Sequence, residues 1–455
     1  MAGQPTLVAR LAAEFLGTFL LIFTVGCNVL SGNAVWGGVS IGCVLMVVIY
    51  ALGGISGANF NPAVSVTLGI CRSMGGPGLD WSTVAQYSAA QLAGGVSAAF
   101  GYTALFGKSV NLTPSPGFGW INACVAELAY TFMLCFVVLN VAAAKKNLQE
   151  KNRYYGLAIG FVIIAGAYGA GAVSGGCFNP AVAFSLDLSS AMLGFGYCIP
   201  YVAAELLGAA LAALLFKVVR PGDYDRTPTA AAELVSEVIG TYMLILTVGL
   251  NVLAGSKAAA FSIAACLTSM IYALGDVSGA HFNPAVTLAI YASARCPDLP
   301  VGKALSYVGC QIAGAIAAAA TYLFIYAGQS VPLGPVGESS WAQVAVAEVI
   351  FTFVLCYMVL CVAVSNRTKS PQMFGLVIGS CVTVGGCAIG SISGGSLNPA
   401  VSIGLSAADL HNGSNLVHAL IYVMLELIGG LAAACTFQVT HAVDVAAMDK
   451  FSLAA

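Results

Sequence analysis

Charged residues are scarce in this chain of 455 residues: Asp, Glu, Lys and Arg together make up 7% of it, as 16 basic and 18 acidic side chains. An average soluble domain carries about 25% of such residues. This shortage excludes a soluble enzyme and a disordered protein, and the net charge of −2 provides no basic surface for nucleic acid. Hydrophobic residues make up 59% of the chain, which predicts that its solvent is lipid.

Histidine is scarcer still, with four residues that fall in different predicted loops and spans. They predict no metal site, and we find no nucleotide-binding loop or catalytic constellation, so we expect neither enzyme activity nor a cofactor. In a secreted protein the 15 cysteines would suggest a disulfide framework. Most of them, such as Cys27, Cys135 and Cys356, lie inside apolar runs as small hydrophobic residues, so we expect few disulfides or none.

One motif occurs four times, and each copy reads Ser-Gly, three further residues and Asn-Pro-Ala-Val. The central triplets are Asn61, Pro62, Ala63; Asn179, Pro180, Ala181; Asn283, Pro284, Ala285; and Asn398, Pro399, Ala400. A glutamate with a threonine four residues after it precedes each copy, namely Glu14, Glu127, Glu237 and Glu348. The first and third copies share Ser-Gly-Ala and the second and fourth share Ser-Gly-Gly, so the chain is a duplication of a duplication.

Three apolar stretches accompany each motif, which predicts twelve membrane spans. They cover 8–30, 35–54, 83–106, 121–143, 154–173 and 195–217, then 232–254, 258–276, 303–327, 341–363, 372–391 and 416–440. Because three is an odd number, successive copies enter the membrane in opposite senses, as inverted repeats do. Six spans per half is an even number, so both halves share one orientation.

A polar stretch rich in proline and glycine, 220–229, marks the boundary between the halves. It predicts a first unit at 1–219, a cytoplasmic linker at 220–231 and a second unit at 232–455. Placing the N-terminus inside puts fourteen of the 16 basic residues on the cytoplasmic side and leaves only Lys108 and Lys257 outside. Because cytoplasmic loops carry the excess of lysine and arginine, we expect a multi-pass integral membrane protein with both termini in the cytoplasm.

Each Asn-Pro-Ala triplet starts an apolar segment, such as 63–70, that is too short to cross a bilayer and so indicates a re-entrant half-helix. Asparagine is a favoured N-cap and proline a favoured first helical residue. When the side-chain oxygen caps the helix, the amide NH₂ is left to donate hydrogen bonds. Two inverted half-helices that meet tip to tip would surround one passage with two positive dipole ends, which favours uncharged solutes and repels cations.

The sequence resembles a known family, most clearly at Ala-Glu-Phe-Leu-Gly-Thr near the N-terminus and at Ser-Gly-Ala-His-Phe-Asn-Pro-Ala-Val-Thr, which ends at Thr287. Over nearly its whole length the chain resembles two aquaporins, members of the major intrinsic protein family, fused head to tail. The resemblance implies an all-α membrane protein of two tandem bundles, each with six transmembrane helices and two re-entrant half-helices. It also implies that Asn61 faces Asn179 in one pore and that Asn283 faces Asn398 in a second.

The same resemblance implies a passive channel for water and small uncharged solutes. Since members of the family are tetramers and this chain carries two units, we expect a homodimer in the lipid bilayer that forms a pseudo-tetramer. The four glutamates of the repeats would accept hydrogen bonds from the re-entrant loops and hold them in place.

Aquaporins narrow a second time at a filter of four residues, one of which is usually an arginine directly after the second Asn-Pro-Ala. Here that arginine is replaced by valine in both units. The positions that match the filter are Ile41, Ala167, Gly176 and Val182 in the first unit and Ile263, Gly386, Gly395 and Val401 in the second. These wide, apolar filters predict permeability beyond water, to solutes of the glycerol, urea, ammonia or peroxide class.

Ionisable residues inside a membrane are candidates for function. Glu205 and Glu426 lie in predicted spans, at positions that match Gln91 and Gln311 of other spans. We favour hydrogen bonds between packed helices over a role in proton or ion binding.

His281 and Asp276 lie near the predicted cytoplasmic mouth of the second pore, where the first unit has Asn59 and Gly54. A histidine that titrates near neutral pH could gate this mouth. A histidine whose hydrogen bonds are satisfied is the favoured interpretation.

Two other functions fit part of the pattern. Secondary transporters also use twelve spans, inverted repeats and broken helices, but they usually need ionisable coupling sites inside the membrane. A poorly conducting scaffold or junction protein would keep the same fold.

Overall fold

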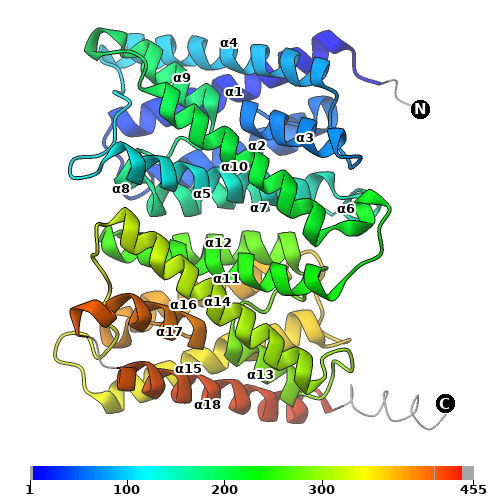
Figure 1. Cartoon of the computed structure of the whole chain (residues 1–455), viewed down its shortest axis with the longest axis vertical. Coiled ribbons are helices and arrows are strands. Elements are labelled where there is room, and N and C mark those ends of the chain that lie inside the picture. The colour runs from blue at the N-terminus through cyan, green and yellow to red at the C-terminus, as the bar shows by residue number, and fades with distance from the viewer. Residues whose placement is uncertain (1–3, 151, 414–415, 443–455) are drawn as a thin grey trace. The chain divides into compact units, whose positions relative to one another are not determined.

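The computed structural model describes residues 4–150, 152–413 and 416–442, and every regular element in these ranges is a helix. The chain divides into two compact units, Met1–Ala232 and Glu233–Ala455 (Figure 1). Two of the basic residues that predict the orientation, Lys151 and Lys450, lie outside the described residues.

The helices of the first unit follow the order expected of two inverted repeats. They are α1 (Leu7–Leu30), α2 (Gly37–Ser56), α3 (Pro62–Ser73), α4 (Trp81–Phe106), α5 (Trp120–Val138), α6 (Lys145–Glu150), α7 (Tyr155–Gly169), α8 (Gly171–Ser174), α9 (Pro180–Ser189) and α10 (Cys198–Val219). The last turn of α5 continues as a π-helix, Leu139–Ala143. The predicted linker contains a 3₁₀ turn, Pro221–Tyr224, which belongs to the first unit.

The second unit repeats this order. Its helices are α11 (Ala230–Leu253), α12 (Ala259–Leu274), α13 (Pro284–Ala292), α14 (Val301–Ile325), α15 (Trp341–Val359), α16 (Phe374–Ser393), α17 (Pro399–Asp409) and α18 (Leu416–Thr440). Here too a π-helix, Leu360–Val364, continues the helix that matches α5, namely α15.

Within the described ranges, nine helices are long and apolar enough to span a membrane. The other three predicted spans correspond to α4, α7 and α12. Helix α4 has 26 residues, whereas α7 and α12 have only 15 and 16. A helix rises about 1.5 Å per residue, so α7 falls short of the roughly 30 Å of hydrocarbon by itself. Its short continuation α8 follows a break at Ala170.

Glycines bring the paired helices of each repeat into close contact. A methyl group added at any of four glycines would lie 2.4–2.6 Å from a backbone oxygen of the facing helix. The pairs are Gly94 with Phe15, Gly208 with Leu128, Gly314 with Val238 and Gly429 with Val349. Small residues allow such close packing of membrane helices. Each glycine lies three residues after Gln91, Glu205, Gln311 or Glu426, so these polar side chains are held against the facing helix.

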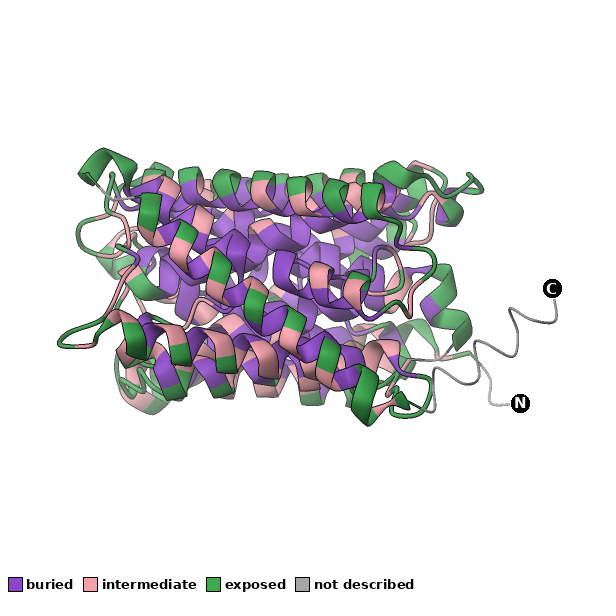
Figure 2. Cartoon of the chain, turned by 90° about the horizontal axis from the view of Figure 1, so that it is seen from below, coloured by how far each residue is buried: buried purple, intermediate pink, exposed green. Residues whose placement is uncertain are grey.

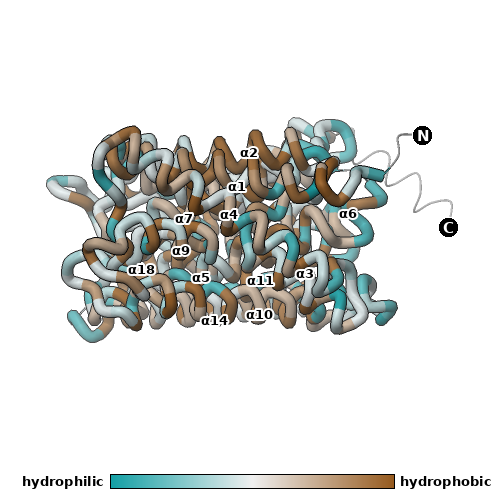
Figure 3. The backbone as a smooth tube through the Cα atoms, turned by 90° about the horizontal axis from the view of Figure 1, so that it is seen from above, coloured by the Kyte–Doolittle hydropathy of each residue, from teal (hydrophilic) through white to brown (hydrophobic). Residues whose placement is uncertain are grey.

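The outer sides of the long helices are apolar and exposed, as a lipid-facing surface requires. On α10, Leu207, Leu211 and Leu214 are 59%, 39% and 53% exposed. Figure 2 shows exposed residues along one side of the long helices and buried residues along the other. Figure 3 shows hydrophobic residues along the helices and hydrophilic ones mainly in the loops at their ends. These features confirm an all-α, multi-pass membrane fold.

The four half-helices α3, α9, α13 and α17 each begin at the proline of a motif. In each, the preceding asparagine caps the helix, because its side-chain oxygen accepts a hydrogen bond from the alanine N–H at 2.8–3.0 Å. The residue before the asparagine has a left-handed backbone, with φ of 49–55°. These residues are Phe60, Phe178, Phe282 and Leu397. Such a conformation is strained for a bulky residue, so the surrounding contacts must hold it.

Candidate functional site

The two half-helices of the first unit are joined at their tips by reciprocal hydrogen bonds. Asn61 Nδ2 donates to the carbonyl oxygen of Phe178 at 2.8 Å, and Asn179 Nδ2 donates to the carbonyl oxygen of Phe60 at 3.0 Å. One N–H of each amide is therefore engaged with the opposite loop. The sequence predicted that this NH₂ group would be left to donate but not which acceptor it would find. An amide NH₂ carries two donors, so one remains for a solute.

The second unit has the same crossed pair. Asn283 Nδ2 donates to Leu397 and Asn398 Nδ2 donates to Phe282, both at 2.9 Å to the carbonyl oxygen. The structure thus brings the four motif asparagines together in the two pairs that the sequence suggested. In each pair, two helix N-termini with partial positive charge meet.

A cavity in the first unit is lined by both motif asparagines and by the positions proposed for its filter. Asn61 and Asn179 line it, and so do the four filter positions Ile41, Ala167, Gly176 and Val182. Most of the other lining side chains are aliphatic, such as Leu21, Leu45, Leu134, Ile159 and Ile163. The path past the asparagines is therefore mainly apolar.

The filter positions proposed for the second unit include two glycines, Gly386 and Gly395. A methyl group added at Gly395 would lie 3.4 Å from Gly386 Cα, so these two glycines are neighbours. A methyl group added at Gly386 would lie 2.8 Å from Ala260 Cβ. Ile263 lies one turn beyond Ala260 on α12 and is half-buried, and Val401 is buried in the first turn of α17.

Ala260 is a residue that sequence reasoning missed. Its equivalent in the first unit is Gly38, where an added methyl group would lie 3.1 Å from Ala167 Cβ. At this contact the alanine lies on α7 in the first unit, as Ala167, and on α12 in the second unit, as Ala260. An alignment of the two units shows that glycine and alanine are exchanged at both positions, but it does not show that the two positions are in contact.

The four repeat glutamates hold the loops in front of the half-helices. In the first unit, Glu14 accepts the N–H groups of Asn59 and Phe60 at 3.0 and 2.8 Å, and Glu127 accepts those of Cys177 and Phe178 at 3.0 and 2.7 Å. In the second unit, Glu237 accepts from His281 and Phe282, and Glu348 accepts from Ser396 and Leu397, at 2.8–3.2 Å. Each carboxylate satisfies backbone donors that would otherwise be buried without a partner.

Glu205 and Glu426 also bind the loops, whereas the sequence favoured contacts between helices. Glu205 Oε1 accepts the backbone N–H of Asn179 at 2.9 Å. Glu426 Oε1 accepts that of Asn398 at 3.1 Å and the Ser402 hydroxyl at 2.9 Å. An apolar helix sequence shows that a buried glutamate needs a partner but does not reveal which one.

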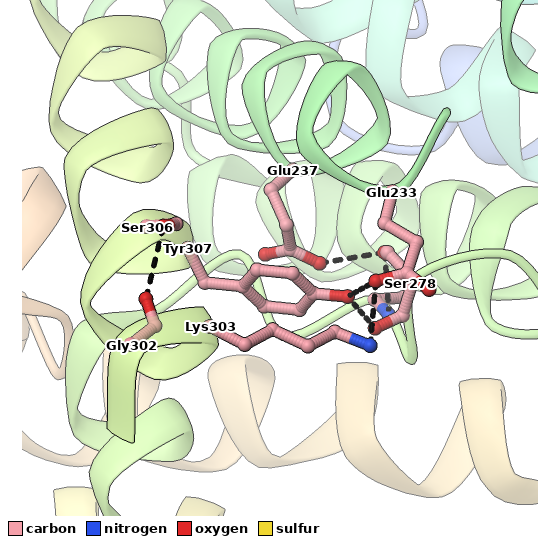
Figure 4. A network of polar contacts seen from close by, with 8 residues as sticks. Glu233, Glu237, Ser278, Gly302, Lys303, Ser306 and Tyr307 are labelled. Carbon is pink, nitrogen blue, oxygen red and sulfur yellow. Dashed lines mark hydrogen bonds and ion pairs between the residues drawn. The ribbon is translucent and has the colours of Figure 1, made fainter. Parts of the chain in front are cut away.

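His281 is buried beside the start of α13. Its Nδ1 lies 3.1 Å from Thr287 Oγ1, and its ring packs edge-on against Tyr307 with centroids 5.2 Å apart. The Tyr307 hydroxyl lies 2.9 Å from both Glu233 Oε2 and the Ser278 carbonyl oxygen, and Lys303 Nζ forms an ion pair with Glu233 at 2.6 Å (Figure 4). We call Glu233, Lys303 and Tyr307 the mouth network.

The first unit has no copy of this ion pair, because Arg10 and Thr83 occupy the positions of Glu233 and Lys303. Asp276 is exposed at the end of α12. Comparing the two units position by position would have revealed the mouth network from sequence. In the part of the chain that the structure describes, no group of three or more His, Cys, Asp or Glu side chains is placed to hold a metal ion.

Comparison with known proteins agrees with this geometry. A family model described as "Major intrinsic protein" matches residues 2–167, 151–250 and 225–437. Aquaporin NIP1-1 of Oryza sativa subsp. japonica is 33% identical over 232 residues, 48% of this chain and 77% of the rice protein. The probable aquaporin AqpM of Archaeoglobus fulgidus is 32% identical over 242 residues, 46% of this chain and 96% of the archaeal protein.

The aquaglyceroporin of Plasmodium falciparum, whose structure has been solved by X-ray methods, aligns with a TM-score of 0.41 at 18% identity, covering 46% of this chain and 96% of that chain. Paired inverted repeats with re-entrant half-helices define a class of multi-pass membrane channels, which conduct water and small solutes. Within that class, the chain belongs to the major intrinsic protein family, and its relatives are channels rather than enzymes.

Proposed function

We propose that each unit forms its own passive pore, and that both pores conduct uncharged solutes larger than water. The cavity of the first unit is the observation that carries this proposal. It joins Asn61 and Asn179 to a filter made of isoleucine, alanine, glycine and valine. No filter position has a fixed charge or a bulky aromatic ring, so size and polarity exclude fewer solutes there.

Val182 supports the proposal because it occupies the position where the family usually has arginine. It lies three residues after Asn179, is 4% exposed and lines the cavity. Val401 is its equivalent in the second unit and is also 4% exposed. The solutes that fit this lining are small and uncharged, of the glycerol, urea, ammonia or peroxide class.

Cations are opposed at the centre of each pore. Two helix N-termini and two asparagine amides point their partial positive charges at the passage. These N–H groups donate hydrogen bonds to solute oxygens, but they do not compensate the lost hydration of a cation.

We further propose that two chains form a dimer with four pores in the bilayer, with both termini in the cytoplasm. Each chain carries two units of the kind that single-unit relatives use, and the exposed apolar faces of its helices fit a lipid or subunit environment. Mass measurement of the purified complex should give two chains. Four chains in one complex would contradict this arrangement.

The test of solute range uses proteoliposomes in a stopped-flow swelling assay with water, glycerol, urea and ammonia. The wild type should pass water and at least one larger solute. The double variant Val182→Arg and Val401→Arg should lower larger-solute flux severalfold relative to water flux, because a long cationic side chain narrows both filters. Val182→Leu with Val401→Leu is the uncharged control. A wild type that passes water and excludes every larger solute would refute the proposed filter.

A further inference from the structure

Each of the four repeats places a second polar side chain next to its loop-supporting glutamate. In the first repeat this is Gln91, whose Nε2 donates to Glu14 Oε2 at 2.8 Å. In the third it is Gln311, whose Nε2 donates to Glu237 Oε2 at 2.9 Å. In these two repeats a neutral amide thus supplies the donor that the carboxylate needs.

The second and fourth repeats have Glu205 and Glu426 at the same position, and both are 0% exposed. One oxygen of each, Oε1, accepts a backbone N–H. The other, Oε2, is fully buried and receives no donor from the described residues. An ionised carboxylate can only accept hydrogen bonds, so a second carboxylate beside Oε2 would be repelled.

A second carboxylate does lie beside each of them. Glu127 accepts the N–H of Phe178, and Glu205 accepts the N–H of the next residue, Asn179. In the second unit, Glu348 and Glu426 accept the N–H groups of Leu397 and Asn398 in the same way. Gly208 allows α10 to approach the backbone of α5 at Leu128, just as Gly94 allows α4 to approach α1 at Phe15. Helices α10 and α5 therefore bring Glu205 to Glu127 as α4 and α1 bring Gln91 to Glu14. The difference is that the second repeat pairs two carboxylic acids, whereas the first pairs an amide with an acid.

We propose that Glu205 and Glu426 are neutral carboxylic acids, and that their Oε2–H groups donate to Glu127 and Glu348. Each pair then holds one proton and one negative charge, and the acid hydroxyl replaces the amide donor of the glutamine repeats. Buried charges are stabilised only when they are paired or hydrogen-bonded, and a shared proton provides this.

The two acids are positioning residues for the pore. Through Oε1 they hold the backbone N–H of Asn179 and Asn398, the residues whose side chains cap α9 and α17 and cross to the opposite loop. The retained proton allows Oε1 to perform this role without placing a second negative charge beside Glu127 or Glu348.

Infrared spectroscopy of the full-length protein in proteoliposomes at pH 7 tests the proposal directly. The wild type should show the carbonyl stretch of protonated carboxylic acids. Glu205→Gln and Glu426→Gln should each remove about half of this band, and the double variant should remove it. Gln91→Glu is the matched gain-of-signal control, because it should add one more protonated acid. A wild type without the band, or a band that both variants leave unchanged, would overturn the proposal.

A second measurement, of solute flux, separates the hydrogen bonds made by Glu205 from the packing of its side chain. Glu205→Leu removes both the Oε1 acceptor and the donor, so flux through the first pore should fall severalfold. Glu205→Gln supplies an oxygen and an NH₂ donor and should restore most of the flux that the leucine variant loses. Equal loss in both variants would contradict the positioning role. The infrared result needs no transport, so it stands or fails separately from the proposed channel function.

Discussion

The two units share the groups that hold their pores but differ in the groups that line the openings. In both, asparagine amides cross to the opposite loop and glutamates accept the loop N–H groups. At the proposed filter, Ala167 faces Gly38 in the first unit, whereas Ala260 faces Gly386 in the second. The ion pair of the mouth network, between Glu233 and Lys303, is formed in the second unit and has no copy in the first. Under the proposed function, the two units would form pores that are supported in the same way but differ at their openings.

The second half of each unit also differs in how firmly its loop is held. Glu127 accepts three donors, from the Ser174 hydroxyl and from the N–H groups of Cys177 and Phe178. Glu348 accepts the N–H groups of Ser396 and Leu397. The Ser393 hydroxyl, which donates to the Ile389 carbonyl oxygen, adds a further polar contact to Glu348. The same position therefore supports more of the loop in the first unit.

The largest effect should come from breaking this support. Glu127→Leu should destabilise the protein by several kcal/mol, and by more than Glu348→Leu, because each buried donor left without a partner costs about 1–3 kcal/mol. Thermal unfolding of the two variants in the same detergent measures the difference. Equal losses would mean that the number of accepted donors does not set the contribution of these glutamates.

A medium effect should follow from crowding the second filter. Gly386→Ala places a methyl group 2.8 Å from Ala260 Cβ. Overpacking of this kind usually costs about 1–3 kcal/mol. Adding Ala260→Gly makes room for the methyl group and reproduces the arrangement of the first unit, so the double variant should recover most of the stability. A double variant as unstable as the single one would show that the two residues do not share one contact.

The smallest effect should come from the mouth network. Lys303→Thr gives the second unit the residue of the first and breaks the ion pair with Glu233, in which both side chains are 31% exposed. Partly exposed pairs contribute about 0.2–1 kcal/mol. The difference in melting temperature between wild type and variant should be small and should shrink in high salt. A large loss of stability that persists in high salt would show that Lys303 stabilises the second unit by more than a partly exposed ion pair does.

Much of the architecture could be predicted because the sequence repeats itself. Four Asn-Pro-Ala triplets and the odd number of spans per repeat were enough to predict the inverted half-helices. The break at Ala170 and the π-helix at Leu139–Ala143 were not predicted. The residues there are mostly apolar, and an apolar pattern does not distinguish an α-turn from a π-turn or from a short break.

The site was predicted less completely than the fold. The resemblance to aquaporins indicated the asparagines and the filter positions. In the first unit, these residues line one cavity. It did not reveal that Glu205 binds the N–H of Asn179, because such a partner lies in a loop whose course a single sequence does not fix. Nor did it reveal the contact between Gly386 and Ala260, which depends on the distance between two helices.

The most direct test of two independent pores is to block them one at a time. Asn179→Trp should fill the first pore, Asn398→Trp should fill the second, and size-exclusion chromatography should show that both variants remain folded. In a stopped-flow swelling assay at equal protein content, each single variant should retain about half of the wild-type water flux and the double variant almost none. Complete loss of flux in a folded single variant would contradict the account and indicate one shared path.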